Sequence, residues 1–587
     1  MKKIIIMIVM IVTLQAEVIE LKPITVTGDG SRTTNYSNLG PLEQVESETV
    51  LQETVPGFKQ PIIHGLMGDK VLLTVDGIKF SNSLFRSGPN QYYSWIPDDF
   101  VVKAELNSNL SGITSSALGG SIDRTIGIDS SSISVATDLS DHKEVVKYKD
   151  GKTMVGVIND KRQNVVTPTE TVQHSAYNQK GFLLGYKTKD YGETKLLFTR
   201  SDDIDRTDKF QQGDYYVYTL QQYLLLSNKY HIPDTDFIIL PSFQQFREKI
   251  DRHSPLKKDI DSTNNMFGLQ ALGYYEPSWT DDGYFSYGLV DNFEDIGYTK
   301  GIIKNNYGYN TFSAYATFHS GYKKLDYDLK YKYSVMTARG SGLDRILDNH
   351  SLGIDTKYRL GFLQSIFVNA DMNYKFPTIT NLAAARDDSV TEIANPDLEQ
   401  EKAYTLTLGY NYDAFTTSIF YKKLSNMIIR EQTNIPDGNG GYKWKYQNTD
   451  NGFIKGLDLK YDKKFENGFG LYGFLEYLDG KTDYDYISKL TPLHTKAKVS
   501  YKPYYLEWLY APSVSESKMA LKDKTDYRIK DHNYGYNIIN IGYAKTFKKV
   551  HSIEVSLDNV FNRTGRVYGS SVDFGARRIS ILYKYSY

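Results

Sequence analysis

The sequence predicts an all-β membrane protein whose main body is an antiparallel transmembrane β-barrel of about 22 strands. Two observations predict this fold. Apolar and polar residues alternate in many short segments, and tyrosine is abundant, with 49 Tyr against 27 Phe. The apolar face of a soluble β-sandwich is a core rich in Val, Ile and Leu, whereas a transmembrane barrel turns that face to lipid and gathers aromatic residues at the two interfaces. The tyrosine-rich faces favour the barrel.

The alternation is clearest in residues 325–335, LDYDLKYKYSV. Leu, Tyr and Val lie on one face, and Asp, Lys and Ser lie on the other. Residues 404–412 repeat the pattern, and after a short turn residues 415–421 run back, which predicts a hairpin. Polar faces of this kind suit a water-filled lumen.

The segment 577–587, RRISILYKYSY, carries aromatic residues on one face up to Tyr587. We expect this face to contact lipid. We also expect this strand to pair with the first barrel strand, because only closure removes the free edges of a sheet in a bilayer.

Composition excludes several classes of protein. The formal net charge is −1 with charged residues well mixed, so no nucleic-acid surface is expected. The absence of cysteine excludes disulfides, zinc–thiolate sites, iron–sulfur clusters and cysteine nucleophiles. The ten histidines are scattered without an i, i+4 pair, so the sequence shows no metal site, and we expect neither catalytic residues nor a cofactor.

The first residues have the pattern of a secretory signal peptide. Lys2 and Lys3 precede the apolar run 4–14, and small residues for cleavage end at Ala16. The run is too short to span a bilayer as a helix. A buried N-terminal strand, the alternative, does not account for the position of the charges, and we therefore predict a signal peptide over residues 1–16.

Residues 28–130 do not follow the barrel pattern. They contain a buried strand, Val71–Val75, that turns at Asp76-Gly77, then a second strand from Phe100 to Leu106, and later the pair Gly119-Gly120. With the upstream VPG of residues 55–57, these elements resemble the plug domain of TonB-dependent outer-membrane receptors.

The barrel region resembles the same family. YKFPTITNL, NPDLEQEKAYTLTLGY, GFIKGLDLKY and SLDNVFNRTGRVYGS are similar to its motifs and occur in the family's order across the exported chain. The resemblance implies a TonB-box segment over residues 17–27, a plug over 28–130 and a barrel over 131–587.

The chain departs from the family pattern at several positions. Ile-His-Gly replaces the usual Ile-Arg-Gly, so that His64 occupies the arginine position, and KFP lacks the usual Arg-Ala. We interpret His64 as a structural, hydrogen-bonded histidine. Tyr587 replaces the commoner phenylalanine, and the resemblance implies that the barrel-assembly machinery recognises this aromatic residue.

The resemblance implies energy-dependent uptake by a monomer in the bacterial outer membrane. The partners would be TonB with its inner-membrane motor proteins, outer-membrane lipid and lipopolysaccharide, and a metal-chelate solute. The extended segment near the mature N-terminus would pair with a sheet edge of TonB, although a disordered terminus is the alternative. The expected TonB-contact residues are Leu21, Pro23, Ile24, Thr25, Val26 and Thr27.

An outward plug loop is expected to hold part of the solute site, because it combines stacking rings with an arginine that suits a carboxylate or a siderophore oxygen. The alternative for each residue is local packing. The solute-binding residues expected are Phe85, Arg86, Asn90, Gln91, Tyr92, Tyr93 and Trp95.

A ferric siderophore is the first candidate solute, and haem, cobalamin and other metal chelates are alternatives. Residues 378–394, between the two barrel motifs, contain no histidine for haem. Two other classes are considered. An outer-membrane enzyme would use loop residues such as Asp259, Asp261, His253 and His350, but no nucleophile motif accompanies them. An open porin would have no use for a plug.

Overall fold

The computed structural model describes residues 45–46, 48–55, 57–85, 92–107, 117–137, 141–253, 258–280, 283–384, 392–437 and 441–587. The predicted signal peptide and the predicted TonB-contact segment lie outside the described residues, as do Arg86, Asn90 and Gln91. No helix in the described ranges combines the length and the apolar character needed to cross a membrane.

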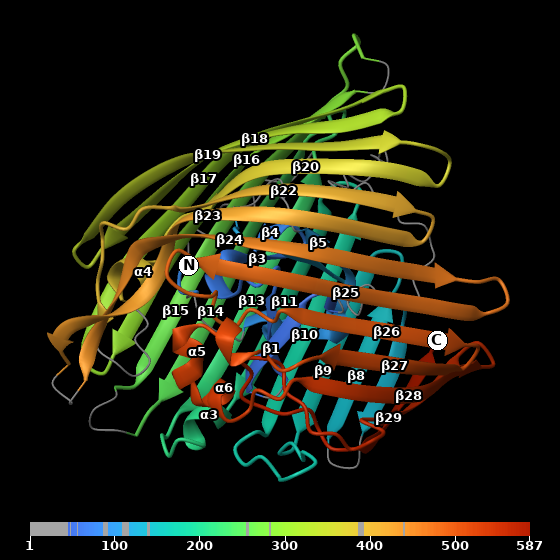
Figure 1. Cartoon of the computed structure of the whole chain (residues 1–587). Helices are drawn as coiled ribbons and strands as arrows, with labels where there is room; N and C mark the ends of the chain where they lie inside the picture. The colour runs from blue at the N-terminus through green and yellow to red at the C-terminus, as the bar shows by residue number, and fades with distance from the viewer. Residues whose placement is uncertain are drawn as a thin grey trace.

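One sheet closes on itself into a barrel of 22 antiparallel strands in the described part of the chain, to which β12 and β21 add two-residue pieces (Figure 1). The predicted fold class is confirmed. The first half of the barrel contains β7 (Ser132–Thr137), β8 (His142–Lys149), β9 (Thr153–Arg162), β10 (Tyr177–Thr188), β11 (Gly192–Asp202), β12 (Ile204–Asp205), β13 (Val217–His231), β14 (Ile238–Asp251), β15 (Ile260–Tyr275), β16 (Tyr284–Lys300), β17 (Ile303–Tyr322) and β18 (Leu325–Gly340). The second half contains β19 (Leu343–Arg359), β20 (Gln364–Lys375), β21 (Glu392–Ile393), β22 (Glu401–Tyr412), β23 (Phe415–Pro436), β24 (Tyr442–Lys464), β25 (Phe469–Thr482), β26 (Leu493–Tyr501), β27 (Tyr504–Ala511), β28 (Tyr536–Phe547), β29 (His551–Asp558) and β30 (Arg578–Ser586).

The barrel closes where β30 pairs with β7, as the sequence predicts. The antiparallel register runs from Ile581 opposite Thr137 to Ser586 opposite Ser132. Tyr587 extends the seam, because its amide donates to the carbonyl of Ser131 at 3.2 Å. No strand edge is then left open at this seam, which is what a bilayer requires of a sheet.

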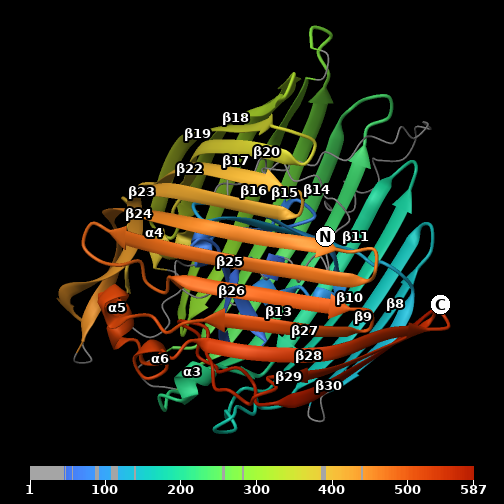
Figure 2. The same ribbon diagram turned by 45° about the vertical axis from the view of Figure 1, so that its right-hand side comes forward.

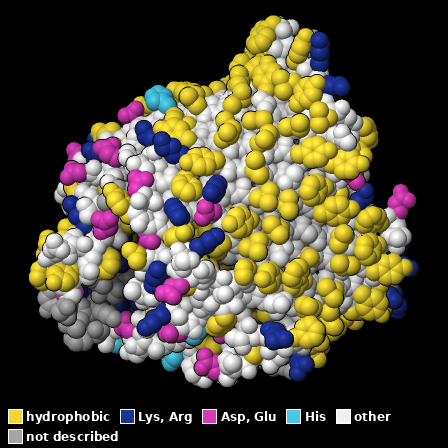
Figure 3. Space-filling view, in the orientation of Figure 1, with side chains coloured by type: hydrophobic (Ala, Val, Ile, Leu, Met, Phe, Trp, Pro, Cys, Tyr) yellow, Lys and Arg dark blue, Asp and Glu magenta, His cyan; other side chains and the backbone are white. Residues whose placement is uncertain are grey.

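The two faces of the strands differ as the alternation predicts. Leu406 and Leu408 in β22 are about half exposed on the outside, whereas Lys330 and Lys332 in β18 are buried toward the lumen. Ile579, Ile581, Tyr583, Tyr585 and Tyr587 are likewise exposed. Figure 3 shows apolar side chains gathered over one half of the visible face and charged side chains toward the opposite end. The apolar half is the surface that lipid would cover.

The two ends of the barrel have different connections. Short turns join the strands at one end, such as the predicted hairpin in which Tyr412 pairs with Phe415 across two residues. We call this the turn end and the opposite end, with longer connections, the loop end. The helices of the loop end are α3 (Thr207–Phe210), α4 (Ile379–Ala383), η4 (Glu516–Lys518), α5 (Leu521–Thr525) and α6 (Tyr527–Lys530).

The residues before β7 form two small sheets inside the barrel, and we call them the plug. Both views of the ribbon place these blue segments within the ring of strands (Figures 1 and 2). One sheet is the hairpin β1–β2, and the other has the order β4-β3-β6-β5, in which β3 and β6 are parallel. The plug elements are β1 (Val50–Val55), β2 (Phe58–Ile62), η1 (Gly68–Lys70), β3 (Val71–Val75), β4 (Ile78–Lys79), η2 (Tyr92–Trp95), η3 (Asp98–Phe100), β5 (Val101–Asn107) and β6 (Gly120–Ile126).

The predicted plug strands are found with small changes. Val71–Val75 is β3, and it turns at Asp76-Gly77, where both residues have positive φ, at 53° and 75°. The second strand begins at Val101 rather than Phe100, because Phe100 completes the short helix η3. Plug and wall share one apolar cluster in which Phe80 meets Tyr223 and Phe246 edge-on, with ring centroids 5.0 and 5.2 Å apart.

Candidate solute site and plug–wall contacts

The described aromatic residues of the predicted solute loop are buried. Phe85 stacks on Tyr92 with ring centroids 4.3 Å apart, and the Tyr93 ring lies 4.5 Å from the Arg124 guanidinium. The indole nitrogen of Trp95 donates to Gln221 of the wall at 3.2 Å. These contacts fix the loop to the plug body and to β13. Contact of these residues with a solute stays a prediction.

A cavity of about 810 Å³ lies between the plug and the wall. The wall residues that line it come from β8, β9, β10, β26, β27 and β28 and from the connections between β9 and β10 and between β29 and β30. This volume lies within the range of about 300–1,000 Å³ that is typical of small-molecule sites. Its charged lining residues, of both signs, are Glu46, Glu53, Lys59, Asp98, Asp99, Asp141, Lys143, Asp160, Arg162, Lys496, Asp558, Asp573, Arg577 and Arg578.

Several of the cavity's basic groups are held by acidic neighbours. Arg162 donates to Asp160 at 2.7 Å and to Asp141 at 3.2 Å, and Lys143 donates to Asp99 of the plug at 2.9 Å. These pairs hold the basic groups at fixed positions on the cavity wall. A solute that carries negative oxygens would share these oriented donors with the carboxylates that already bind them.

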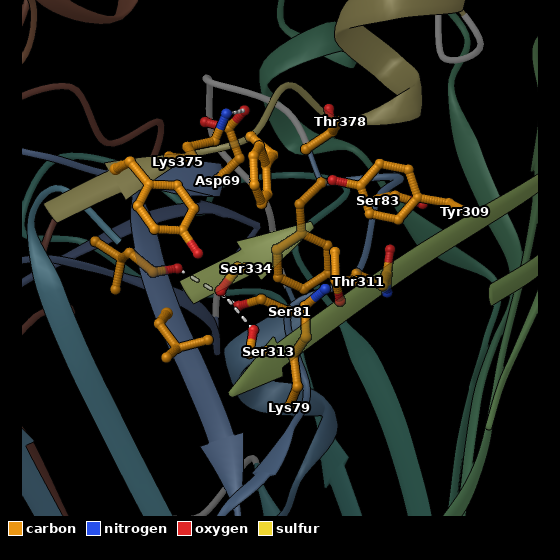
Figure 4. A pocket seen from close by; sticks show the side chains of 16 residues that line it. Asp69, Lys79, Ser81, Ser83, Tyr309, Thr311, Ser313, Ser334, Lys375 and Thr378 are labelled. Atoms are coloured by element: carbon orange, nitrogen blue, oxygen red, sulfur yellow. Dashed lines mark hydrogen bonds and ion pairs between the residues drawn. The ribbon is translucent and has the colours of Figure 1, made fainter. Parts of the chain in front are cut away.

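A second, smaller pocket of about 60 Å³ lies on the opposite side of the plug, next to β17, β18 and β20 (Figure 4). The close-up shows Asp69 and Lys375 near one another at its rim, and Ser313 hydrogen-bonded to Ser334 at 2.6 Å. The pocket is large enough for only a few water molecules. It marks the place where charged plug and wall residues meet.

A four-charge cluster joins plug and wall beside this pocket. Lys375 lies 2.9 Å from Asp69 of the plug and 3.3 Å from Glu401, and Lys70 of the plug also pairs with Glu401. The amide of Ile428 donates to Glu401 at 2.8 Å. All four charged side chains are buried, so the two positive and two negative charges compensate one another in a site of low dielectric constant.

Glu294 makes a second contact of this kind. Its carboxylate accepts from the amide and hydroxyl of Ser83 at 2.9 and 2.7 Å, and it lies 3.5 Å from the Lys79 amine. Ser83 and Lys79 belong to the plug and Glu294 to β16. Hydrogen bonds to a buried charge are among the stronger ones in proteins, so this contact holds the chain after β4 to the wall.

A third contact involves Asp76 at the predicted plug turn. Lys195 of β11 donates to Asp76 at 3.0 Å and to the carbonyl of Ile126 at 2.7 Å. Burial raises the pKa of Asp76 to about 6, although Lys195 opposes the shift. Of the two groups, only the Asp76 carboxyl therefore titrates near pH 6.

The predicted Gly119-Gly120 pair lies where a wall lysine reaches the plug backbone. Lys422 donates to the carbonyls of Leu118 and Gly119 at 2.6 and 3.2 Å. A Cβ at Gly119 would come within 3.0 Å of Leu66 and 3.3 Å of two backbone carbonyls. A larger residue here would require Leu66 and the carbonyls of Ile63 and Lys70 to move by a few tenths of an ångström, which favours glycine.

The plug blocks the lumen in two ways: it occupies the space, and its buried polar groups are bonded to the wall. Each contact pairs buried plug and wall groups, so moving the plug would separate charges that water does not reach. Sequence reasoning did not identify Asp69, Lys375, Glu294 or Glu401. The sequence did show charged residues at the alternate strand positions that face the lumen. It did not show which plug residue each of these charges contacts.

Three of the residues considered for an enzyme, His253, Asp259 and Asp261, lie at the β14–β15 connection, where the Arg252 amide donates to Asp259 at 2.9 Å, and His350 lies apart from them. His350 lies in β19, where it bonds to the Tyr331 hydroxyl at 2.8 Å, and Asp261 lies in β15, 3.3 Å from Lys249. His253 pairs with Asp251 at 2.9 Å in the connection after β14. These contacts are local ones within neighbouring strands.

The family model described as "TonB dependent receptor-like, beta-barrel" matches residues 128–562. The chain belongs to this family. The members of this family are transporters and receptors. The fold implies that the protein lies in the outer membrane. No curated protein matches the sequence.

Solved structures share the receptor's fold at low sequence identity. The copper transporter OprC is 10% identical to this chain and has a TM-score of 0.76. The matched region covers 93% of this chain and 95% of the OprC chain. The siderophore receptor PirA from Acinetobacter baumannii is 12% identical with a TM-score of 0.70, covering 94% and 96%. The Serratia marcescens hemophore receptor HasR, a double mutant in complex with hemophore and haem, is 11% identical with a TM-score of 0.69, covering 90% and 93%.

Proposed function

We propose that the receptor takes up a scarce, large metal chelate, a ferric siderophore first among them, when TonB releases the plug. The observation that carries this proposal is a closed barrel whose plug is fastened by buried ion pairs. Passive diffusion through such a barrel is blocked, and breaking the contacts requires work. The outer membrane has no ATP, so the work must come through a partner.

The division of the chain belongs to the same proposal. Residues 1–16 direct export, residues 17–27 bind TonB, residues 28–130 form the plug, and residues 131–587 form the barrel. In this scheme Leu21, Pro23, Ile24, Thr25, Val26 and Thr27 pair with a sheet edge of TonB in the periplasm, at the turn end.

The solute is proposed to bind at the loop end, between the loop from Phe85 to Trp95 and the 810 Å³ cavity. Arg86 suits the anionic oxygens of a siderophore, and Arg162 and Lys143 would bind such oxygens in competition with Asp160, Asp141 and Asp99. The fold is shared with a copper transporter, a hemophore receptor and a siderophore receptor. Copper, haem and cobalamin are therefore the competing solutes in the test.

Growth of a deletion strain on single metal sources tests the proposal. Each culture receives one ferric siderophore, haem, cobalamin or copper as its limiting source, and a plasmid restores the wild-type gene as the control. We expect growth to fail on one ferric siderophore and to return with the plasmid. Failure on haem, cobalamin or copper alone would keep the transport class and replace the solute, whereas unchanged growth on every source would contradict uptake.

A further inference from the structure

Three charged or titratable side chains form a row across the barrel wall. Asp458 in β24 is the register partner of Glu476 in β25, and Glu476 is the register partner of His494 in β26. Direct cross-strand partners project to the same face of a sheet, and here that face is the lumen. Two carboxylates directly opposite one another repel unless a cation or a proton lies between them.

The plug supplies a fourth group to this row. Ile63 and Leu66 exchange two backbone hydrogen bonds of 3.0 and 2.9 Å, which makes His64 and Gly65 the tip of a tight turn. Both tip residues have positive φ, 46° and 76°, a conformation that is uncommon for a residue other than glycine. The turn directs the His64 imidazole at the wall, where its Nε2 lies 3.7 Å from Asp458 Oδ2 and 3.8 Å from Glu476 Oε1.

Three ring nitrogens of the two histidines in this cluster lack a hydrogen-bond partner. The His494 side chain is 5% exposed, and neither of its ring nitrogens has a hydrogen-bond partner, although Nδ1 lies 3.4 Å from Glu476 Oε2. His64 Nδ1 and Asp458 Oδ1 also lack a partner. Buried polar atoms without partners are costly and point to a group that completes the site.

The charges around the cluster also call for a cation. Lys422 is the nearby base, and its amine donates to two plug carbonyls rather than to the carboxylates. Asp458 Oδ2 accepts a long hydrogen bond of 3.3 Å from the Ser418 hydroxyl, in addition to facing His64. An arginine at position 64 would bring a fixed positive charge, which a neutral imidazole does not.

We propose that His64, Asp458, Glu476 and His494 bind one divalent transition-metal ion, with Zn²⁺ the best fit, and that the ion ties the plug to the wall. The ligand atoms of His64, Asp458 and Glu476 all lie within 4.8 Å of one another. Tetrahedral ligands at about 2.0–2.2 Å from zinc lie about 3.4 Å apart. His494 Nδ1 is 3.4 Å from Glu476 Oε2, and His64 Nε2 is 3.7 and 3.8 Å from the two carboxylates, so His64 would move a few tenths of an ångström toward the ion. Two nitrogen and two oxygen donors suit zinc, and His494 also lines the 810 Å³ cavity, which gives the ion an entry path.

Cobalt substitution tests the site directly. The full-length receptor is purified in detergent, stripped with chelator and titrated with Co²⁺, whose visible absorption reports tetrahedral coordination, and Zn²⁺ is then added as a competitor. We expect one Co²⁺ per chain, displaced by one Zn²⁺. His64→Asn, which tolerates positive φ, and His494→Gln should each weaken binding at least about tenfold.

His551→Gln is the matched control, because His551 lies at the turn end against Tyr583, away from the cluster. Heat-modifiable gel migration establishes that each variant has a folded barrel. Zn²⁺ should also raise the temperature at which the plug of the wild type becomes sensitive to protease, and should leave the two site variants unchanged. No Co²⁺ spectrum in the wild type, or equal binding by the site variants and the control, would overturn the proposal.

Discussion

Glu401 is the residue on which the four-charge cluster depends. It meets Lys70 of the plug on one side and Lys375 of the wall on the other, and it is fully buried. Glu401 is the first residue of β22, at the loop end of the barrel. A single carboxylate therefore balances two buried amines, one from each part of the protein.

Replacing Glu401 with glutamine should loosen the plug. The substitution removes the carboxylate that pairs with Lys70 and leaves Lys375 with Asp69, and breaking a buried pair typically costs about 3–5 kcal/mol. We expect the urea concentration at which a protease cleaves the plug to fall clearly. Glu399→Gln is the control, because Glu399 pairs with Arg345 at 2.7 Å but is about half exposed. Equal urea midpoints for the two variants would show that the cluster does not hold the plug.

Asp76 should make plug stability depend on pH. Its folded pKa of about 6 lies above the ordinary value of 3.8, so the folded plug binds a proton more tightly than the unfolded chain does. The stability from this proton is fully present below pH 3.8 and is lost as the pH rises through 6, a change of at most about 3 kcal/mol. Urea unfolding of the plug between pH 4 and 8 measures it.

Asp76→Asn is the informative variant for this prediction. Asparagine tolerates the positive φ of this position and keeps an acceptor for the Ile126 amide, which Asp76 binds at 3.0 Å. The difference in plug stability between pH 4 and pH 7 should shrink in the variant. An unchanged pH profile would assign the dependence to other groups.

The individual strands were accessible from the sequence, because alternation depends on neighbours along the chain. The alternation in residues 325–335 predicted which residues lie on each face of β18. The turn residues Asp76-Gly77 predicted where β3 ends. Pairing between distant segments could not be predicted in this way. An example is the register of β24, β25 and β26, which brings Asp458, Glu476 and His494 together. No local pattern encodes that row, and the one hint was His64 in place of an arginine.

The solute loop shows the same limit of local patterns. Its rings and its arginine suggested a binding element, yet the described aromatic residues lie within the apolar cluster that plug and wall share. A cluster of aromatic residues in a loop has the same composition whether it stacks on itself or on a solute. Only the position of β13 and β14 beside it decides the packing, as the bond from Trp95 to Gln221 shows.

The segment from Leu21 to Thr27 carries the prediction that belongs to a single element. Ile24→Pro should abolish uptake of the identified solute and leave its binding unchanged, because proline removes a backbone donor from a strand added to TonB. Radiolabelled uptake and binding to whole cells measure the two effects separately. Ile24→Val keeps the donor and the extended preference, and serves as the control. Normal uptake by Ile24→Pro would place the coupling segment elsewhere.

The whole molecule is a closed barrel whose plug is bonded to the wall. Purified receptor in a planar bilayer should have a conductance near zero, because the plug fills the lumen and its charged groups pair with the wall. Deletion of residues 28–130 should produce large, steady conductance steps, since a barrel of about 22 strands encloses a wide lumen. A steady native conductance of similar size would contradict a blocked lumen and favour an open porin.

The seam between β7 and β30 sets an order on biogenesis. Tyr587 donates its hydroxyl proton to the carbonyl of Lys147, 440 positions away, at 3.3 Å. A contact of such long range is among the last to form, because closing so large a loop carries a high entropic cost. The plug is synthesised long before β30, so it exists before the ring that will surround it is complete. Assembly must therefore either close the wall around the plug or admit the plug after closure, and in the first case pairing of β30 with β7 is the last step.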